Sequence, residues 1–394
     1  MSQFETTVNL AGQRVPDVRS NACHVLEKQN TAGHDLTVIN WQSHREFHLT
    51  LRPLPGENPM GIVRRLAAIM GNEGASIVRH EIFGSITAHA ETGRALRHEF
   101  GSVDWPVTWV EGSGSGNEGV SGMHIFAVTG TQVDTIHQEG KVIGRIFDDG
   151  CVRHCFLGNL VSSNSSISKS AQSGEMFERM EHALLEAGMA MTNVVRTWLF
   201  LDDILSWYEE FNGIRTGFFM KKKLSNGLLP ASTGVGGRNP AGTAIVGGAW
   251  AVQSTDGSVV VQAVPSPQQC SSLEYGSAFN RAVLIDVPAG RRLLISGTAS
   301  IEPNGRSAHV GDLCKQIRLT MEVAHAILAS RGFNFSDITR ATAYFKNIQY
   351  APAFDAWRQK QKVGPFPLVV AEATICRDEL LFEIELDALV MCQA

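Results

Sequence analysis

A strand near the C-terminus carries the residue best suited to acid catalysis. Alternation in Leu381-Phe382-Glu383-Ile384-Glu385 predicts that Glu383 and Glu385 share one face, opposite Phe382 and Ile384. A carboxyl in a cleft with apolar walls has a raised pKa, because burial disfavours the charged form, and it can then act as a general acid. The alternative is an exposed glutamate paired with a basic residue. We interpret Glu383 as the acid.

Cys376 precedes that glutamate by seven residues, on a segment that the pattern predicts to be an edge strand. A thiolate is a good nucleophile if a neighbouring cation stabilises it. A lone cysteine is more often a small buried hydrophobe, so both interpretations stay open.

A glycine-rich stretch, Ser232-Thr233-Gly234-Val235-Gly236-Gly237, offers a second kind of site. It lacks the Lys-Ser/Thr pair of a phosphate-binding loop and the spacing of a dinucleotide fingerprint. Backbone N–H groups around Gly234 can still bind a carboxylate or an oxyanion. A tight turn between two strands is the alternative.

The elements that position these residues come from one unit that occurs three times. Each copy has a glycine, small polar residues, two β-branched residues, an arginine and a later aromatic residue. The shared positions are Gly71, Arg79 and Phe83; Gly188, Arg196 and Phe200; and Gly332, Arg340 and Tyr344.

Each copy has the same predicted neighbours. An amphipathic helix precedes it (62–70, 175–187 and 313–331), and a second helix follows its strand (88–100, 204–219 and 353–362). Closing strands are expected at 106–110 and 380–390. This order predicts an α+β fold with mixed sheets, each backed by two helices. We expect an N-terminal extension (1–40), a partial unit (41–111) and two full units (112–264 and 265–394).

Composition limits the class of protein. The 394 residues are 43% hydrophobic, and 34 basic against 39 acidic residues give a net charge of −5, so no basic nucleic-acid-binding surface is indicated. Seven scattered cysteines predict no disulfide framework. No apolar run reaches 18 residues, and the N-terminus lacks a signal-peptide pattern. We therefore expect a cytoplasmic protein with a small-molecule ligand and no membrane partner.

The third unit resembles a YjgF/Rid-type (RutC-like, endoribonuclease L-PSP) domain. The resemblance rests on Ser296-Gly297, Gly311-Asp312, Gln316, Gly332, Pro365-Phe366-Pro367 and the strand from Leu381 to Glu385. It implies a chorismate-mutase-like fold that forms trimers, with ligand clefts between adjacent domains. Three such units in one chain then predict a covalent pseudo-trimer that is a monomer, although a homo-oligomer stays possible.

Within this superfamily, the second and third units are most similar to chorismatases. The matching stretches are Arg196-Thr197-Trp198, Tyr208, Phe211, Arg215, Pro230 to Gly236, Leu294 to Ala299, His309 to Asp312 and Tyr344-Phe345-Lys346. The resemblance implies that Glu383 protonates the methylene carbon of an enol ether, without a metal or organic cofactor. It also implies that Cys376 steers the product, as in the branch that makes 3-hydroxybenzoate.

A chorismate-like substrate has two carboxylates and so needs fixed cations, for which the arginine fork is well shaped. The candidates are Arg196, Arg215, Arg238 and Lys346, with Tyr208 and Tyr344 as hydrogen-bond donors. Arg196 has an alternative role in a structural ion pair, since all three units carry this arginine. Lys346 stands where a chorismatase has arginine.

These observations favour a chorismatase-like hydrolase or lyase that releases pyruvate. A Rid-type enamine or imine deaminase, or a non-catalytic metabolite-binding protein, is the alternative. Rid-type deaminases carry an arginine shortly after the Phe-Pro of the last unit, whereas here Pro367 is followed by Leu368-Val369-Val370.

Overall fold

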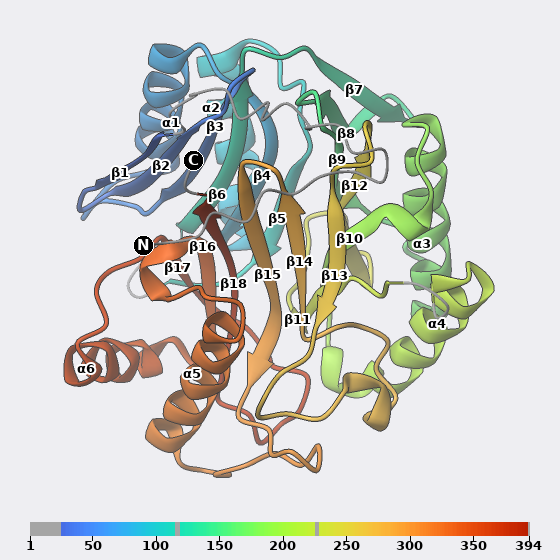
Figure 1. The fold of residues 1–394 in the computed structure, drawn as a ribbon, viewed down its shortest axis with the longest axis vertical. Helices are drawn as coiled ribbons and strands as arrows, with labels where there is room; N and C mark the ends of the chain where they lie inside the picture. The colour runs from blue at the N-terminus through green and yellow to red at the C-terminus, as the bar shows by residue number, and fades with distance from the viewer. Residues whose placement is uncertain (1–24, 115–118, 225–227, 393–394) are drawn as a thin grey trace, which may run out of the picture.

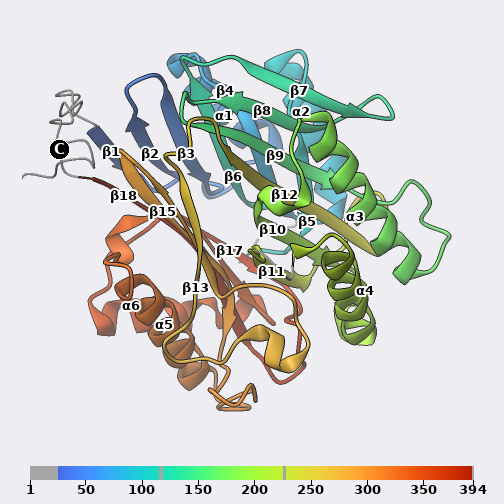
Figure 2. The ribbon, with the colours of Figure 1, turned by 45° about the vertical axis from the view of Figure 1, so that its right-hand side comes forward.

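The computed structural model describes residues 25–114, 119–224 and 228–392, which form three mixed sheets of six strands each. Helices in pairs cover the outer face of each sheet, and the three sheets face one another around a common centre (Figures 1 and 2). The predicted fold of three tandem YjgF-like units in a pseudo-trimer is thus confirmed.

The first sheet has the strand order β1-β2-β3-β6-β4-β5. Its elements are β1 (Val25–Asn30), β2 (His34–Asn40), β3 (Arg45–Leu51), α1 (Pro59–Glu73), β4 (Ser76–Gly84), α2 (His89–Phe100), β5 (Val107–Glu111) and β6 (Val120–Thr129). This sheet reaches beyond both limits, 41 and 111, that the sequence suggests for the first unit. The strand expected to close the unit at 106–110 is the parallel edge strand β5, and β6 runs between β3 and β4.

The second sheet repeats this topology with the order β11-β10-β12-β9-β8-β7. Its elements are β7 (Val133–Gln138), β8 (Lys141–Asp148), β9 (Val152–Leu160), α3 (Lys169–Glu186), β10 (Val194–Leu201), α4 (Tyr208–Lys221), β11 (Ala231–Gly236) and β12 (Ile245–Ser254). The glycine-rich stretch at 232–236 is therefore edge strand β11, parallel to β10, and not a turn.

The third sheet has the order β13-β14-β15-β18-β16-β17. Its elements are β13 (Val260–Val264), β14 (Ala282–Val287), β15 (Gly290–Ala299), α5 (Leu313–Ala329), β16 (Ile338–Phe345), α6 (Ala351–Gln361), β17 (Leu368–Glu372) and β18 (Phe382–Met391). Cys376, expected on an edge strand, lies instead in the connection between β17 and β18.

The helices follow from local sequence signals. In α5 the apolar residues Ile317, Met321, Ala324 and Leu328 recur every three or four positions, and all four are buried against the sheet. Asp312 caps this helix by accepting a hydrogen bond from the backbone N–H of Lys315. None of the described helices is long and apolar enough to cross a membrane.

A shared apolar core holds the three units together. Each unit buries its own layer between sheet and helices, and a further cluster combines side chains from all three sheets. Phe83, Phe200 and Tyr344, which occupy the same position in the three repeats, all belong to this central cluster. The repeated aromatic position therefore places one strand of each unit against the common core. The three units meet where these strands pack together.

Candidate active site

A cavity of about 270 Å³ lies between the second and third units. The edge strand β11 closes one side of it against β15: Ser296 Oγ accepts from the backbone N–H of Ser232 (2.8 Å), and the N–H of Gly297 donates to Thr233 Oγ1 (3.1 Å). This volume of about 270 Å³ lies just below the usual range of roughly 300–1,000 Å³ for small-molecule sites.

Helix α4 presents one face to this cavity. Tyr208, Asn212 and Arg215 all line it, and their spacing of four and then three residues places them on one side of the helix. Arg215 is 1% exposed and donates from Nη2 to Asn212 Oδ1 at 2.7 Å. Burial raises the pKa of the Tyr208 hydroxyl, which therefore stays protonated.

Glu383 is the second residue of β18 and faces the same cavity, with 4% of its surface exposed. Burial raises the pKa of its carboxyl to about 8, and the negative charge of Glu385 adds to this effect, while Arg281 and Arg196 act in the opposite direction. A carboxyl of this kind is protonated at neutral pH. It can therefore donate a proton to a bound ligand.

Gly297 leaves the space that the Glu383 carboxyl occupies. A Cβ at position 297 would overlap the Oε1 of Glu383, so any larger residue must displace the acid. Gly234 has a similar role in β11, where it lines the cavity opposite the Tyr208 ring. Gly234 thus contributes to the site by having no side chain, which leaves part of the cavity open beside Tyr208.

Cys376 also lines the cavity, beside Glu383 and Tyr208. Burial raises the pKa of its thiol to about 12, and the nearby Glu383 adds to this, whereas Arg377 lowers it by less. The thiol is therefore uncharged near pH 7. The one cation that lowers this pKa, Arg377, does not outweigh burial, so the structure does not favour the thiolate nucleophile envisaged from the sequence.

The sequence pattern did not indicate the basic and aromatic residues that the third unit contributes. Tyr275, Phe279 and Arg281 lie just before β14, and Arg377 follows Cys376. None of them belongs to the repeated positions, and the loops that carry them have no periodicity. The segment with Tyr275, Phe279 and Arg281, between β13 and β14, is much longer than the matching connections between β1 and β2 and between β7 and β8, and this extra length is the signal that could have indicated it.

Two arginines in the cavity have unused hydrogen-bonding capacity. Nε of Arg215 and Nη2 of Arg281 are buried without a hydrogen-bond partner among the described residues. Among the residues that the structure describes, no carboxylate lies within ion-pair distance of either guanidinium. Since buried charges are normally paired, the cavity is suited to an anionic ligand.

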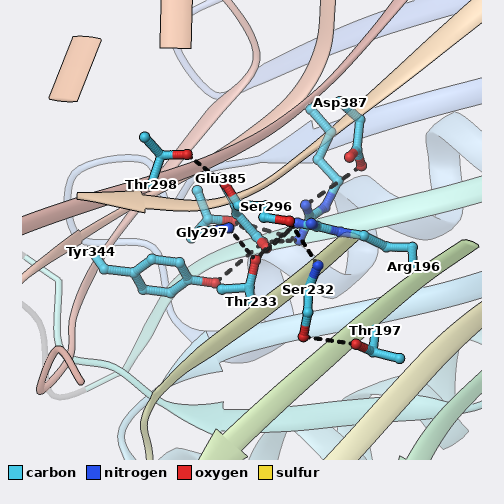
Figure 3. Close-up of polar contacts among 12 residues, drawn as sticks. Arg196, Thr197, Ser232, Thr233, Ser296, Gly297, Thr298, Tyr344, Glu385 and Asp387 are labelled. Atoms are coloured by element: carbon cyan, nitrogen blue, oxygen red, sulfur yellow. Dashed lines mark hydrogen bonds and ion pairs between the residues drawn. The ribbon is translucent and has the colours of Figure 1, made fainter. Parts of the chain in front are cut away.

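Arg196 and Tyr344, both expected to bind substrate, point instead at Glu385 (Figure 3). Arg196 Nη2 lies 2.6 Å from Glu385 Oε2, the Tyr344 hydroxyl donates to Oε1 at 3.2 Å, and Thr233 also binds this carboxylate. Burial would raise the pKa of Glu385, but Arg340 and Arg196 outweigh burial and lower it. The repeated arginine thus has the structural ion pair considered above as its alternative role.

Arg238 and Lys346 also lie outside the cavity. Arg238 is 62% exposed in its side chain and forms a two-pronged ion pair with Glu111 of the first unit. Lys346 Nζ lies 2.7 Å from Asp378 Oδ1 and also donates to the carbonyl of Asp378. Both cations are used in contacts between surface segments.

A second cavity lies where all three units meet, but its volume is about 30 Å³. Buried ionisable side chains line it, including His48, His124, Arg340 and Asp387. This space suits one or two water molecules and is too small for a ring acid. In the described ranges, no three histidine, cysteine or acidic side chains are grouped as a metal site requires.

Comparisons with known proteins agree with this architecture. Residues 270–390 match the family model Endoribonuclease L-PSP. A 3-hydroxybenzoate synthase from Streptomyces hygroscopicus is 28% identical over 239 residues, which cover 53% of this chain and 66%, just under two thirds, of that protein. A RutC family protein from Pyrococcus horikoshii is 27% identical over 100 residues, or 25% of this chain and 79% of that protein.

A solved chorismatase structure has the same fold. It superposes with a TM-score of 0.62 at 15% sequence identity, over 87% of this chain and 98% of the chorismatase chain. The family match, the two relatives and the shared fold agree: residues 270–390 are similar to a YjgF/RutC-like domain, and most of the chain has the fold of a chorismatase.

Proposed function

We propose that this chain is a chorismatase-type enzyme that cleaves the enolpyruvyl ether of chorismate, or of a related cyclic carboxylic acid, and releases pyruvate. One observation carries the proposal: a buried carboxyl with a pKa of about 8 faces a cavity that also holds two arginines without carboxylate partners. The similarity to 3-hydroxybenzoate synthase and to chorismatase supports this substrate class.

Glu383 acts as the general acid. Its proton goes to the terminal methylene carbon of the enol ether, and the electrons of the C=C bond form the new C–H bond. Positive charge then develops on the carbon that bears the ether oxygen, and the carboxylate left on Glu383 supplies a negative charge in the same cavity. The raised pKa makes the acid available at neutral pH.

Two outcomes balance from this cation. In hydrolysis, one water adds to the charged carbon, the resulting hemiketal breaks its bond to the ring oxygen, and pyruvate and a dihydroxy ring acid leave. In hydrolysis followed by aromatisation, the same water addition releases pyruvate, the ring then loses its other hydroxyl as water together with a ring hydrogen, and a hydroxybenzoate forms, so that no water is consumed overall. In both outcomes a proton returns to Glu383.

Arg215 and Arg281 bind the two carboxylates of the substrate. Both side chains line the cavity, both are at least 95% buried, and each has an N–H group without a partner among the described residues. Charge-assisted hydrogen bonds of this kind are strong and directional. They hold the enol ether at a fixed distance from Glu383.

Cys376 steers the product as an uncharged side chain. It lines the cavity near Tyr208 and Glu383, so a change in its size changes the space that a water molecule can occupy when the cation forms. Cys376→Ala is expected to change the ratio of dihydroxy acid to hydroxybenzoate without abolishing pyruvate release. Chromatography of the ring products measures this ratio.

The direct test is pyruvate release from chorismate by the purified chain, followed with a coupled lactate dehydrogenase assay. We expect Glu383→Gln to lower kcat by about 10²- to 10⁴-fold, the range that a positioned general acid contributes. Glu322→Gln, on the exposed face of α5, is the matched control and should keep full activity. An inactive wild type, or an active Glu383→Gln, would contradict the proposal.

The two other functions have distinct signatures. Ammonia release from reactive imines would indicate a Rid-type deaminase. A rise in melting temperature with chorismate, without any turnover, would indicate a metabolite-binding protein.

A further inference from the structure

Three arginines and two aromatic rings alternate along one wall of the cavity. Arg215 Cζ lies 5.5 Å from the centre of the Phe279 ring, and Arg281 Cζ lies 5.6 Å from the same ring. Arg281 is also 5.3 Å from the centre of the Tyr275 ring, which in turn lies 5.4 Å from Arg377 Cζ. We call this row of five side chains the cation ladder.

The cation ladder holds several positive charges close together in one buried cavity. Like charges in a poorly hydrated cavity repel one another, and among the described residues no carboxylate pairs with Arg215 or Arg281. An aromatic ring next to a guanidinium attracts it through the negative face of the ring and also occupies the space between two cations. Phe279 lies against both Arg215 and Arg281, so its ring can attract each guanidinium and limit how closely the two approach.

The segment that carries the rings is itself fixed. Ser271 caps the short helix Ser272–Tyr275, accepting from the backbone N–H of Leu273 while Glu274 binds the N–H of Ser271. Ser272 Oγ donates to the carbonyl of Phe279 at 2.5 Å. The separation between the arginines is thus set by the backbone as well as by the rings.

The end of this segment is also tied to the second unit. The backbone N–H of Asn280 donates to the carbonyl of Pro230 at 2.9 Å, and its side chain donates to the carbonyl of Leu229. These contacts hold Phe279 and Arg281 against the unit that supplies Arg215. The ladder therefore spans the boundary between the two units.

We propose that Phe279 and Tyr275 are positioning residues that space the arginines into separate carboxylate subsites, so that the cavity selects ring acids with two carboxylates over those with one. This inference rests on the proposed function for the identity of the substrate. It assigns the selectivity to the aromatic rungs, because the charges alone would attract any anion.

The test compares equilibrium binding of benzoate and 3-(carboxymethoxy)benzoate to the full chain by calorimetry. We expect the dicarboxylate to bind at least about tenfold more tightly than benzoate to the wild type. Phe279→Leu should reduce this ratio to below about threefold, mainly by weakening the dicarboxylate. Phe335→Leu, which changes an aromatic residue packed against Trp357 and Phe366 outside the cavity, is the matched control.

Tyr275→Leu and Tyr275→Phe repeat the test at the second ring, so that the result does not depend on a substitution at the buried Phe279 alone. The leucine variant should lower the ratio, and the phenylalanine variant, which keeps the ring, should preserve it. An unchanged ratio in both leucine variants, or a wild type without preference for the dicarboxylate, would overturn the inference.

The failure of this inference is distinguishable from that of the proposed function. A ratio that depends on Phe279 in a chain that releases no pyruvate from chorismate supports the ladder and contradicts the proposed reaction. Pyruvate release from chorismate, together with a binding ratio that the ring variants leave unchanged, supports the proposed reaction and contradicts the role of the cation ladder.

Discussion

The boundary between the second and third units carries an acid, whereas the corresponding strand positions in the other two units do not. Glu383 pairs across the sheet with Tyr344, Gly122 pairs with Phe83, and Val246 pairs with Phe200. Since the three aromatic residues occupy the same repeat position, a glycine and a valine stand where the third unit has its acid. The repeated scaffold therefore supplies the frame, and one copy supplies the chemistry.

The edge strands differ in the same way. The residues one place before the shared aromatic position pair with Trp109 in the first unit, Gly234 in the second and Val370 in the third. Trp109 is buried in the core of its unit, while Gly234 leaves room beside Tyr208. The cavity thus lies beside an edge-strand position that has no side chain, whereas in the first unit the Trp109 side chain occupies the corresponding place.

The largest expected effect concerns the pH dependence of folding stability. The pKa of Glu383 is about 8 in the folded protein and near 4.5 when unfolded, so its stabilising contribution is complete below about pH 4.5 and is lost as pH rises through 8. At roughly 1.4 kcal/mol for each pH unit between the two pKa values, the loss reaches a few kcal/mol at pH 9. Denaturant unfolding between pH 5 and 9 should show Glu383→Gln gaining stability relative to the wild type.

Parallel curves for Glu383→Gln and the wild type over this range would mean that the acid is solvated. The same series with Glu322→Gln should follow the wild type throughout, because that glutamate is exposed on α5.

A carboxyl placed at the equivalent position of the second unit should find no cavity. Val246 is fully buried in the central cluster, so Val246→Glu forces an unpaired acid into apolar surroundings. We expect a loss of about 3 kcal/mol or more in the free energy of unfolding, measured in urea. Val246→Met, which keeps an apolar side chain, is the control. Equal stability of the two variants would contradict the view that only the third unit accommodates a carboxyl at this strand position.

Two matched glycines separate an effect on the acid from an effect on packing. Gly297→Ala places a methyl group against the Glu383 carboxyl, whereas Gly158→Ala, at the corresponding place in β9, meets Thr108 Oγ1 at 2.8 Å. We expect Gly297→Ala to lower kcat by about 10- to 100-fold, and Gly158→Ala to lower the melting temperature with kcat nearly unchanged. Equal losses of kcat in the two variants would contradict the idea that Gly297 acts through the Glu383 carboxyl.

The smallest effect is expected for the two basic residues outside the cavity. Arg238→Ala and Lys346→Ala each break an exposed ion pair, which typically contributes less than about 1 kcal/mol. KM for the substrate should stay within about twofold of the wild type. A tenfold rise in KM for either variant would show that the residue reaches the substrate.

Local sequence patterns predicted most of the architecture. The amphipathic spacing of Ile317, Met321, Ala324 and Leu328 identified α5, and the shared Gly, Arg and aromatic positions identified three copies of one unit. They missed β1 and β2 in the first sheet. The side chains of β1 after Leu26 are exposed, so this edge strand has no apolar alternation that marks it as part of a sheet.

The triplicated unit and the shared face of Glu383 and Glu385 are evident from the order of residues alone, because strand geometry alternates side chains whatever the surroundings. The packing of distant segments, by contrast, places Glu383 in the cavity and pairs Glu385 with Arg196, 189 residues away. It also decided that Arg281 lies in the cavity and Arg238 does not. The pKa and partners of a buried charge depend on every group that packs around it, and those groups come from distant parts of the chain.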